Sequence, residues 1–240
     1  QATTTKIAEG ASLDASAYDF GDGGEIVVWS DIHHSNSKTI VKGTLRAEGG
    51  KIKGNGGKIE TSGRSLEIND IKISTKSNIG VDGQWLIDPY DITIRNNSGS
   101  HSDMNGSYTA TANNAVVDIG TLENALNSNN VTVFTSNGGF QNGDITVQDP
   151  ISSNSSNDLT LDSQGDIIIN ADITRSGSGG LVLNANSNQV NGTGTINLAS
   201  GSSISAEAGV TVQNNINLTS SGNVNFGGGT GTSTYSGSIS

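Results

Sequence analysis

The 240-residue chain has no cysteine, two prolines and few aromatic residues, which make up 4% of it. Without cysteine it can form neither disulfides nor thiolate metal sites. Only 32% of the residues are hydrophobic, so a compact globule would bury too little apolar surface to offset its chain entropy. Two alternatives remain: disorder, or a repeat architecture in which small apolar residues stack between neighbouring coils. A period in the sequence distinguishes them.

Positive charge is also scarce, above all in the second half. The net charge is −11; residues 1–95 hold eleven Lys and Arg against thirteen Asp and Glu, whereas residues 96–240 hold one cation, Arg175, against ten acids. Such a chain repels phosphate backbones and anionic lipid surfaces, so we expect no nucleic-acid partner. No apolar run reaches the roughly 18 residues that a membrane helix needs, and we expect no membrane insertion.

A period of 22 residues is present in the middle of the chain. Residues 143–164 align without a gap on residues 165–186, and the five apolar positions that coincide are Ile145 on Ile167, Val147 on Ile169, Ile151 on Ile173, Leu159 on Leu181 and Leu161 on Leu183. Each copy contains two apolar–polar–apolar triplets, which is the periodicity of strands, separated by turn residues. Low-complexity sequence aligned by chance would not keep five apolar positions in register. We therefore predict stacked coils with apolar columns inside a tube.

The rest of the chain extends this pattern with changes. A later copy near residues 208–216, shifted by 65 residues, places Val212 on Val147 and Val224 on Leu159. We divide the chain into β-helix coils at 1–95, an irregular insertion with a short helix at 96–140, and coils of about 22 residues at 141–240. In the first part Gly23-Gly-Glu-Ile recurs 33 residues later as Gly56-Gly-Lys-Ile, Ile40 and Ile73 share that spacing, and Thr39–Leu45 is expected as one strand. In the insertion, Thr121 is the expected cap of a helix at Leu122–Leu126, followed by a strand at Val131–Thr135.

Three segments in this order carry a family resemblance: Gly23-Gly-Glu-Ile-Val-Val-Trp-Ser-Asp31, Gly54-Asn-Gly-Gly-Lys-Ile-Glu-Thr-Ser-Gly63 and Trp85-Leu-Ile-Asp-Pro-Tyr-Asp-Ile-Thr-Ile94. Together they resemble filamentous-haemagglutinin-like proteins, in particular the high-molecular-weight adhesins of the two-partner secretion route. The resemblance implies an all-β fold, a right-handed parallel β-helix (solenoid), here with an inserted loop and short helix. It also implies secretion to the outer surface of a Gram-negative cell, a role in virulence, and a host-cell receptor or glycan as partner.

The same resemblance implies export through an outer-membrane two-partner secretion transporter. The family's amino-terminal secretion domain carries Asn-Pro-Asn motifs, which are not found in this sequence. We therefore expect an interior piece of a larger protein, whose transporter is engaged by a region absent here. A haemopexin-type receptor for a host plasma protein, from the same secretion family, is an alternative with the same fold.

The enzymatic alternative is a carbohydrate-cleaving β-helix, in which carboxylates cluster in a groove. Here Asp144 and Asp166 are in register, with Asp149, Asp158, Asp162 and Asp172 nearby. Both follow glycine at the start of a strand, where aspartate bonds the turn backbone, and Arg175 is the only cation of that region. We therefore expect no enzyme activity, no catalytic residue and no cofactor.

Other single residues give weaker signals. The adjacent His33 and His34 would point to opposite faces of a strand, and with His101 they are expected as solvated residues, so no metal site is predicted. Trp29 and Trp85 are expected in the core, with sugar stacking as the alternative. Candidate glycosylation sites follow from the Asn-x-Ser/Thr triplets at Asn96, Asn105, Asn130, Asn154, Asn191 and Asn217. The 28 Asn of the chain make about six such triplets expected by chance, so modification rests on the family.

Overall fold

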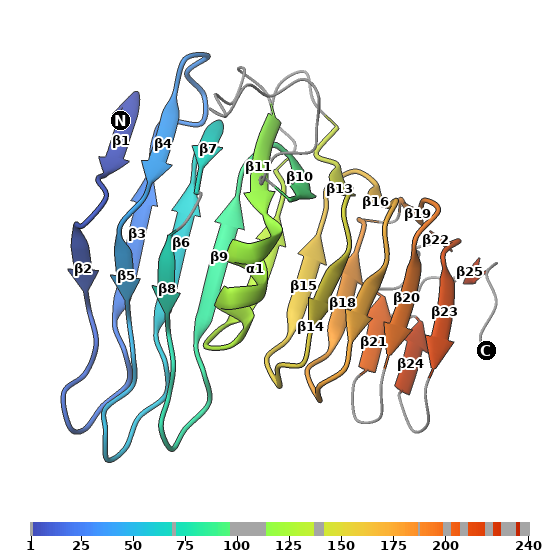
Figure 1. Ribbon diagram of the computed structural model, residues 1–240. Helices are drawn as coiled ribbons and strands as arrows, with labels where there is room; N and C mark the ends of the chain where they lie inside the picture. Colours follow the sequence, from blue (N-terminus) through green and yellow to red (C-terminus); the bar gives the residue numbers. More distant parts are fainter. Residues whose placement is uncertain are drawn as a thin grey trace.

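The computed structural model describes residues 2–68, 71–96, 114–136, 142–186, 188–198, 203–206, 211–218, 223–226 and 234–235. Its strands form parallel ladders between successive coils (Figure 1). With strands spaced about 4.8 Å apart, the stack is about 40 Å long. The predicted all-β fold, a parallel β-helix with one short helix, is confirmed.

Each coil contributes strands to three faces of the tube. The ten-stranded sheet has the order β1 (Thr4–Ile7), β4 (Lys38–Val41), β7 (Ser65–Glu67), β11 (Asn114–Asp118), β10 (Asp91–Arg95), β13 (Ile145–Val147), β16 (Ile167–Ile169), β19 (Gln189–Asn191), β22 (Thr211–Val212) and β25 (Thr234–Tyr235). The eight-stranded sheet consists of β3 (Glu25–Trp29), β6 (Lys58–Ser62), β9 (Gln84–Asp88), β12 (Asn130–Phe134), β15 (Leu159–Asp162), β18 (Leu181–Asn184), β21 (Ser203–Ala206) and β24 (Asn223–Phe226). The third face is split into β2 (Ser12–Asp14), β5 (Thr44–Arg46) and β8 (Lys72–Ser74), then β14 (Ile151–Ser153), β17 (Ile173–Arg175), β20 (Thr195–Leu198) and β23 (Asn215–Leu218).

The 22-residue period corresponds to the register of the ladders. Ile145 pairs with Ile167 and Leu159 with Leu181, as predicted. The seven side chains predicted to face the interior are fully buried; they are Ile145, Val147, Ile167, Ile169, Leu159, Leu181 and Leu183. Polar residues between them, such as Thr146, stay partly exposed. Strand alternation therefore separates the core from the surface in each coil.

Two details of the predicted register are wrong. Val212 lies in the column of Ile167 and Val190, two positions from the predicted alignment on Val147, because the coils between them have other lengths. The glycine repeat is right, since Glu25 pairs with Lys58, but Ile73 pairs with Leu45 and not with Ile40.

The stretch Thr39–Leu45 forms two strands, β4 and β5, and not one. The chain turns a corner between them at Gly43, where a Cβ atom would lie 2.4 Å from the carbonyl oxygen of Ala11. Only glycine fits at this approach of two coils, so the corner is fixed by a residue that the hydrophobic pattern passes over.

The first three coils carry long projections, which we call the arms. Arm 1 (residues 15–24), arm 2 (residues 47–57) and arm 3 (residues 75–83) connect the third face to the eight-stranded sheet and extend beyond the later coils (Figure 1). Backbone hydrogen bonds join neighbouring arms, for example from Ala17 N to Glu48 O at 2.9 Å and from Gly49 N to Lys76 O at 3.0 Å. The arms therefore form one stacked projection.

The helix α1 (Ile119–Leu126) occupies the gap in the third face between β8 and β14 (Figure 1). In the ten-stranded sheet two strands, β11 and β10, lie between β7 and β13, whereas in the eight-stranded sheet only β12 lies between β9 and β15. A helix is about 10 Å wide, or roughly two strand spacings. The helix therefore takes about the width that β11 and β10 take together on the adjoining face.

The segment from residue 96 to 140 is described from residue 114 to 136. Its strands β11 and β12 are rungs of the two large sheets. The helix cap is Asp118, not Thr121: the Asp118 carboxylate accepts a 2.9 Å hydrogen bond from Thr121 N. The expected strand Val131–Thr135 is β12, shifted by one residue. In the described part of the chain no helix is long and apolar enough to cross a membrane.

The buried columns predict a strong asymmetry between neighbouring residues of β16. Ile167→Asp places a charge between two coils and should lower the free energy of unfolding by about 3–5 kcal/mol. Ile168→Asp, on the partly exposed side of the same strand, should cost less than about 1 kcal/mol. Urea unfolding of both variants measures the difference. Similar losses in the two variants would contradict the assigned faces.

Candidate binding surface

The carboxylates that suggested catalysis bond the backbone of the next coil. Asp144 Oδ1 accepts a 2.8 Å hydrogen bond from Asp166 N, and Asp166 Oδ1 accepts one of 3.0 Å from Gln189 N. The predicted backbone-bonding role of these two residues is therefore observed, although each bond reaches across to the neighbouring coil and not within its own turn.

Further side chains follow the same rule at other corners of the tube. Asp91 Oδ1 accepts from the N–H groups of Gly143 and Asp144 at 2.8 and 2.9 Å. Asp158, Asp172 and Asp149 each accept one backbone bond from another coil, donated by Gly180, Thr195 and Asn96 respectively. Each bond satisfies an N–H at a place where the strand ladder is interrupted. We call this set the corner clamps.

Arg175 lies inside the tube, where a ligand cannot reach it. Its side chain is fully buried and donates from Nη2 to Asn157 O. Burial lowers its pKa, against an attraction to Asp158 that raises it. Arg175, the cation that an acidic sugar would need in this region, therefore belongs to the interior of the tube and not to its surface.

The remaining polar candidates separate into buried and exposed residues. Trp85 is fully buried and donates to Thr61 Oγ1 at 3.1 Å, as expected for a core residue, whereas Trp29 is 50% exposed. His33 and His34 are exposed in a turn, and His101 lies outside the described residues. Among the described residues no group of His, Asp and Glu is arranged to hold a metal ion.

The sequons differ in accessibility. Asn154 and Asn96 are exposed, whereas the Asn130 side chain clamps two coils: Oδ1 accepts from Asp158 N at 2.9 Å and Nδ2 donates to Asp82 O at 3.1 Å. Asn154 and Asn96 are thus better placed for a glycan than Asn130. The remaining sequons are Asn191, partly buried in β19, Asn217, in β23 with its side chain outside the described part, and Asn105, outside the described residues.

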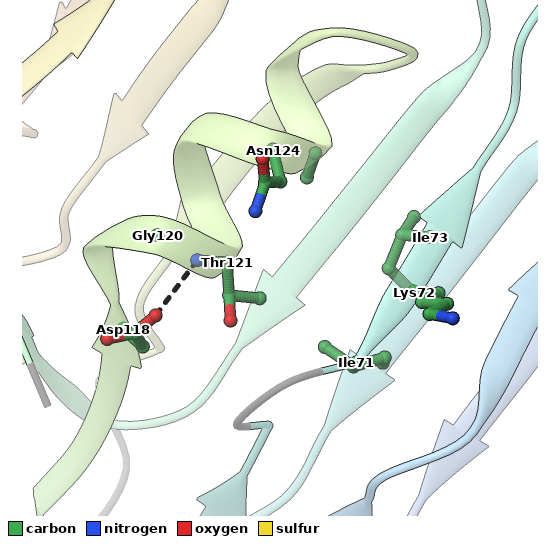
Figure 2. A pocket seen from close by; sticks show the side chains of 8 residues that line it. Ile71, Lys72, Ile73, Asp118, Gly120, Thr121 and Asn124 are labelled. Atoms are coloured by element: carbon green, nitrogen blue, oxygen red, sulfur yellow. Dashed lines mark hydrogen bonds between the residues drawn. The ribbon is translucent and has the colours of Figure 1, made fainter. Parts of the chain in front are cut away.

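A groove of about 500 Å³ separates β8 from the helix. Figure 2 shows Ile71, Lys72 and Ile73 on one side and Thr121 and Asn124 on the other. The groove exists because a round helix stands where a flat strand would continue the face. It offers aliphatic walls with an ammonium and an amide group at the rim.

A second, open groove of about 850 Å³ lies where the arms join the eight-stranded sheet, on a glycine floor. The floor is close-packed, since a Cβ on Gly57 would lie 2.1 Å from Gly24 O. Asp82, on the groove wall, accepts hydrogen bonds from Ser77 N and Asn157 Nδ2. The exposed Glu25 and Lys58, neighbours in the ladder, complete a polar rim.

The arms carry most of the exposed apolar surface in the described part of the chain. Eight large hydrophobic side chains are exposed among the described residues, and five of them lie on the arms: Tyr18, Phe20, Ile52, Ile79 and Val81. No sequence pattern predicted this set, because the arms interrupt the strand pattern and their apolar residues stand singly among Gly, Asp and Lys.

Comparison with known proteins adds no assignment. The sequence matches no protein-family model and no curated protein. The geometry and the residues themselves therefore carry the functional argument.

Asp88 in β9 has an altered ionisation. Burial raises its pKa to about 6, the charge of Glu60 adds to the rise, and a hydrogen bond with Ser136 opposes it. Because an unfolded Asp titrates near 3.9, the folded state binds more protons between about pH 4 and pH 6. The free energy of unfolding should therefore fall as pH rises through this window, by up to about 3 kcal/mol.

Asp88→Asn should abolish that dependence, making the protein about 1–3 kcal/mol more stable than wild type at pH 7 and no more stable below about pH 4. Glu60→Gln, which removes the second cause, should shift the wild-type dependence to lower pH. Urea unfolding at a series of pH values tests both. Parallel profiles for wild type and Asp88→Asn would contradict the buried charge.

Proposed function

We propose that the chain acts by contact, as a rod-shaped segment of a secreted bacterial surface adhesin that binds a host-cell receptor or glycoconjugate. The resemblance of its three ordered segments to filamentous-haemagglutinin-like adhesins supports this role, and so does the solenoid, the fold that the resemblance implies. Export would use an outer-membrane transporter through a region outside this chain.

The observation that carries the proposal is the use of the corner clamps. Glycoside hydrolysis needs two carboxylates that face a shared substrate site. Asp144 and Asp166 instead each hold a backbone N–H of the following coil, so Oδ1 of each carboxylate is engaged in the fold. A general acid or base must be free to exchange its proton with the substrate, and a side chain oriented by a backbone bond to the next coil is less free to do so.

The surface supports contact in a second way. A solenoid offers long faces on which outward side chains repeat at the strand spacing. On the eight-stranded sheet one outward column contains the neighbouring residues Leu86, Thr132 and Thr160, all partly exposed. Projections from a rigid scaffold add recognition elements that the repeat does not constrain, and here the arms have that position.

The proposal is tested by comparing attachment with cleavage. Purified wild-type chain should bind cultured epithelial cells in a saturable manner and should leave a panel of polysaccharides uncleaved. Asp144→Asn/Asp166→Asn should behave identically, because each amide oxygen still accepts the clamp bond. The matched Asp144→Ala/Asp166→Ala variant should lose about 1–2 kcal/mol of stability per clamp.

Two results would oppose the proposal. Cleavage by the wild type that disappears in the Asn variant would show that the carboxylates are catalytic. Absence of attachment, together with capture of one plasma protein from host plasma, would assign the chain as a soluble-protein receptor and not as an adhesin.

A further inference from the structure

The tips of the three arms form one apolar edge. Tyr18 and Phe20 on arm 1 are 76% and 68% exposed, Ile52 on arm 2 is 53% exposed, and Ile79 and Val81 on arm 3 are both 69% exposed. Large side chains with such exposure, gathered on one projection, indicate an interaction surface.

Hydrogen bonds between the arms fix the backbone that carries these side chains. Tyr18 O and Asp19 O accept hydrogen bonds from Lys51 N and Ile52 N at 3.1 and 2.8 Å, and Phe20 forms a β-bridge with Lys53. Arm 3 is tied to arm 2, since Val81 N donates to the Asn55 side chain at 3.0 Å and Ser77 Oγ donates to Gly54 O at 2.6 Å. The three arm tips are therefore bonded to one another across three coils, and their exposed apolar side chains stand on one joined projection.

The same edge carries cations in a protein of net charge −11. Lys51, Lys53 and Lys76 are exposed on the arms. The arms also hold four acids, of which Asp22 is exposed and Asp19, Glu48 and Asp82 are partly buried. The Lys51 ammonium lies 4.4 Å from the centre of the Tyr18 ring. The edge thus combines aromatic rings, branched aliphatic groups and an excess of exposed lysine.

We infer that the arm tips bind a lipid bilayer at the depth of its headgroups, with the apolar side chains in the interface and the lysines on anionic headgroups. Aromatic side chains settle at that depth, lysine reaches from it to the phosphates, and apolar burial and charge act together there. The inference rests on the proposed adhesin role only in that the bilayer would belong to a host cell.

Two observations favour a bilayer over a second protein copy. The exposed charges of the arms, three lysines against one aspartate, would repel in a symmetric tip-to-tip contact, in which the same patch meets itself. The edge is also only three coils wide, about 10–15 Å at the strand spacing. It is therefore a narrow strip, whereas a stable protein interface needs a broad patch of about 800 Å² on each partner. A bilayer needs no matching shape.

The net charge of the chain opposes long-range attraction to anionic lipid. In water containing 0.15 M salt a charge is felt over about 8 Å. The acidic C-terminal coils lie further along the stack than the arms (Figure 1), so the charges that act at this edge are those of the arms, where exposed lysines outnumber the exposed acid.

The experiment uses a fluorescent reporter on the tip. Phe20→Trp is made in a Trp29→Phe background, where the buried Trp85 gives a constant signal. Titration with vesicles of phosphatidylcholine, with or without phosphatidylserine, should shift the emission of the new tryptophan to shorter wavelength, and brominated lipid should quench it. Binding to phosphatidylserine vesicles should weaken as salt rises.

Variants of the native chain then separate the contributions in vesicle co-sedimentation. Phe20→Ser/Ile79→Ser should reduce binding by at least about tenfold through lost apolar contact. Lys51→Gln/Lys53→Gln should reduce it about fivefold per lysine, only when phosphatidylserine is present. Val27→Ser, an exposed position of β3 away from the arms, should change nothing, and thermal unfolding should show all variants folded.

The outcomes are distinct. No spectral shift and no co-sedimentation of the wild type would overturn the inference, as would a concentration-dependent dimer in sedimentation equilibrium that the Phe20→Ser/Ile79→Ser variant abolishes. Cell attachment that survives this variant unchanged, without vesicle binding by the wild type, would reject the lipid site and leave the adhesin proposal standing. Vesicle binding without cell attachment would support the lipid site and reject the adhesin role.

Discussion

The parallel hydrogen-bond ladder between coils is the constraint on which the rest of this structure depends. Every coil must present its N–H and C=O groups at the spacing of its neighbour, so residues of successive coils stand in columns, such as Ile145 on Ile167. A column that faces inward is mostly apolar, because a buried polar side chain needs a hydrogen-bond partner. Thr61, which stands between Val28 and Ile87, finds one in Trp85. At the corners, where the ladder pauses, Asp144 and Asp166 restore the missing bonds with their side chains. The scarcity of large apolar residues is thus no obstacle to folding, since small ones stack over the whole length.

The region around α1 shows how far the ladder can deviate. The order of the strands in the sheet differs there from their order in the chain, because β11 lies between β7 and β10. The insertion is accommodated because the helix takes about the width of two strands on the adjoining face. Side chains and not a ladder join this region to its neighbours: Glu123 in α1 accepts a 2.7 Å bond from Ser152 N in β14, and Asn129, beyond the end of α1, accepts one of 2.7 Å from Thr75 N, just beyond β8. Where a helix replaces a strand, the neighbouring strands keep backbone N–H and C=O groups that no ladder pairs. Glu123 and Asn129 accept hydrogen bonds from two of these N–H groups.

The sequence was informative where the period was strict and misleading where spacing changed. Five apolar positions repeated without a gap determine which side chains of β13 to β18 face inward, and alternation is enough to predict this. Val212 was misplaced because one shift of 65 residues was applied to every strand of a coil. Ile73 was misplaced because the 33-residue spacing of the glycine repeat was carried to strands joined by turns of other lengths, and turn length is set by turn chemistry, not by the core. The strand order β7-β11-β10 has no local signal at all, since it is decided by which edges remain unpaired. The candidate surfaces were missed for a related reason: Tyr18 and Ile79 are single apolar residues within polar segments and belong to no pattern along the chain.

A division of labour between repeat and departure from repeat follows from these constraints. Where the ladder is regular, titratable groups are drawn into holding it: carboxylates such as Asp144, Asp166 and Asp158 clamp the coils, and Arg175 is buried among them. A residue that must bond the next coil is not free to follow a ligand, so on the regular coils recognition is left to the outward side chains of the strands. The arms escape this because they are tied together mainly through their backbones, which leaves the side chains of their tips without a structural duty. The arms carry exposed aromatic and aliphatic side chains beside lysines, none of which the fold requires. A binding role accounts for these side chains better than a structural one.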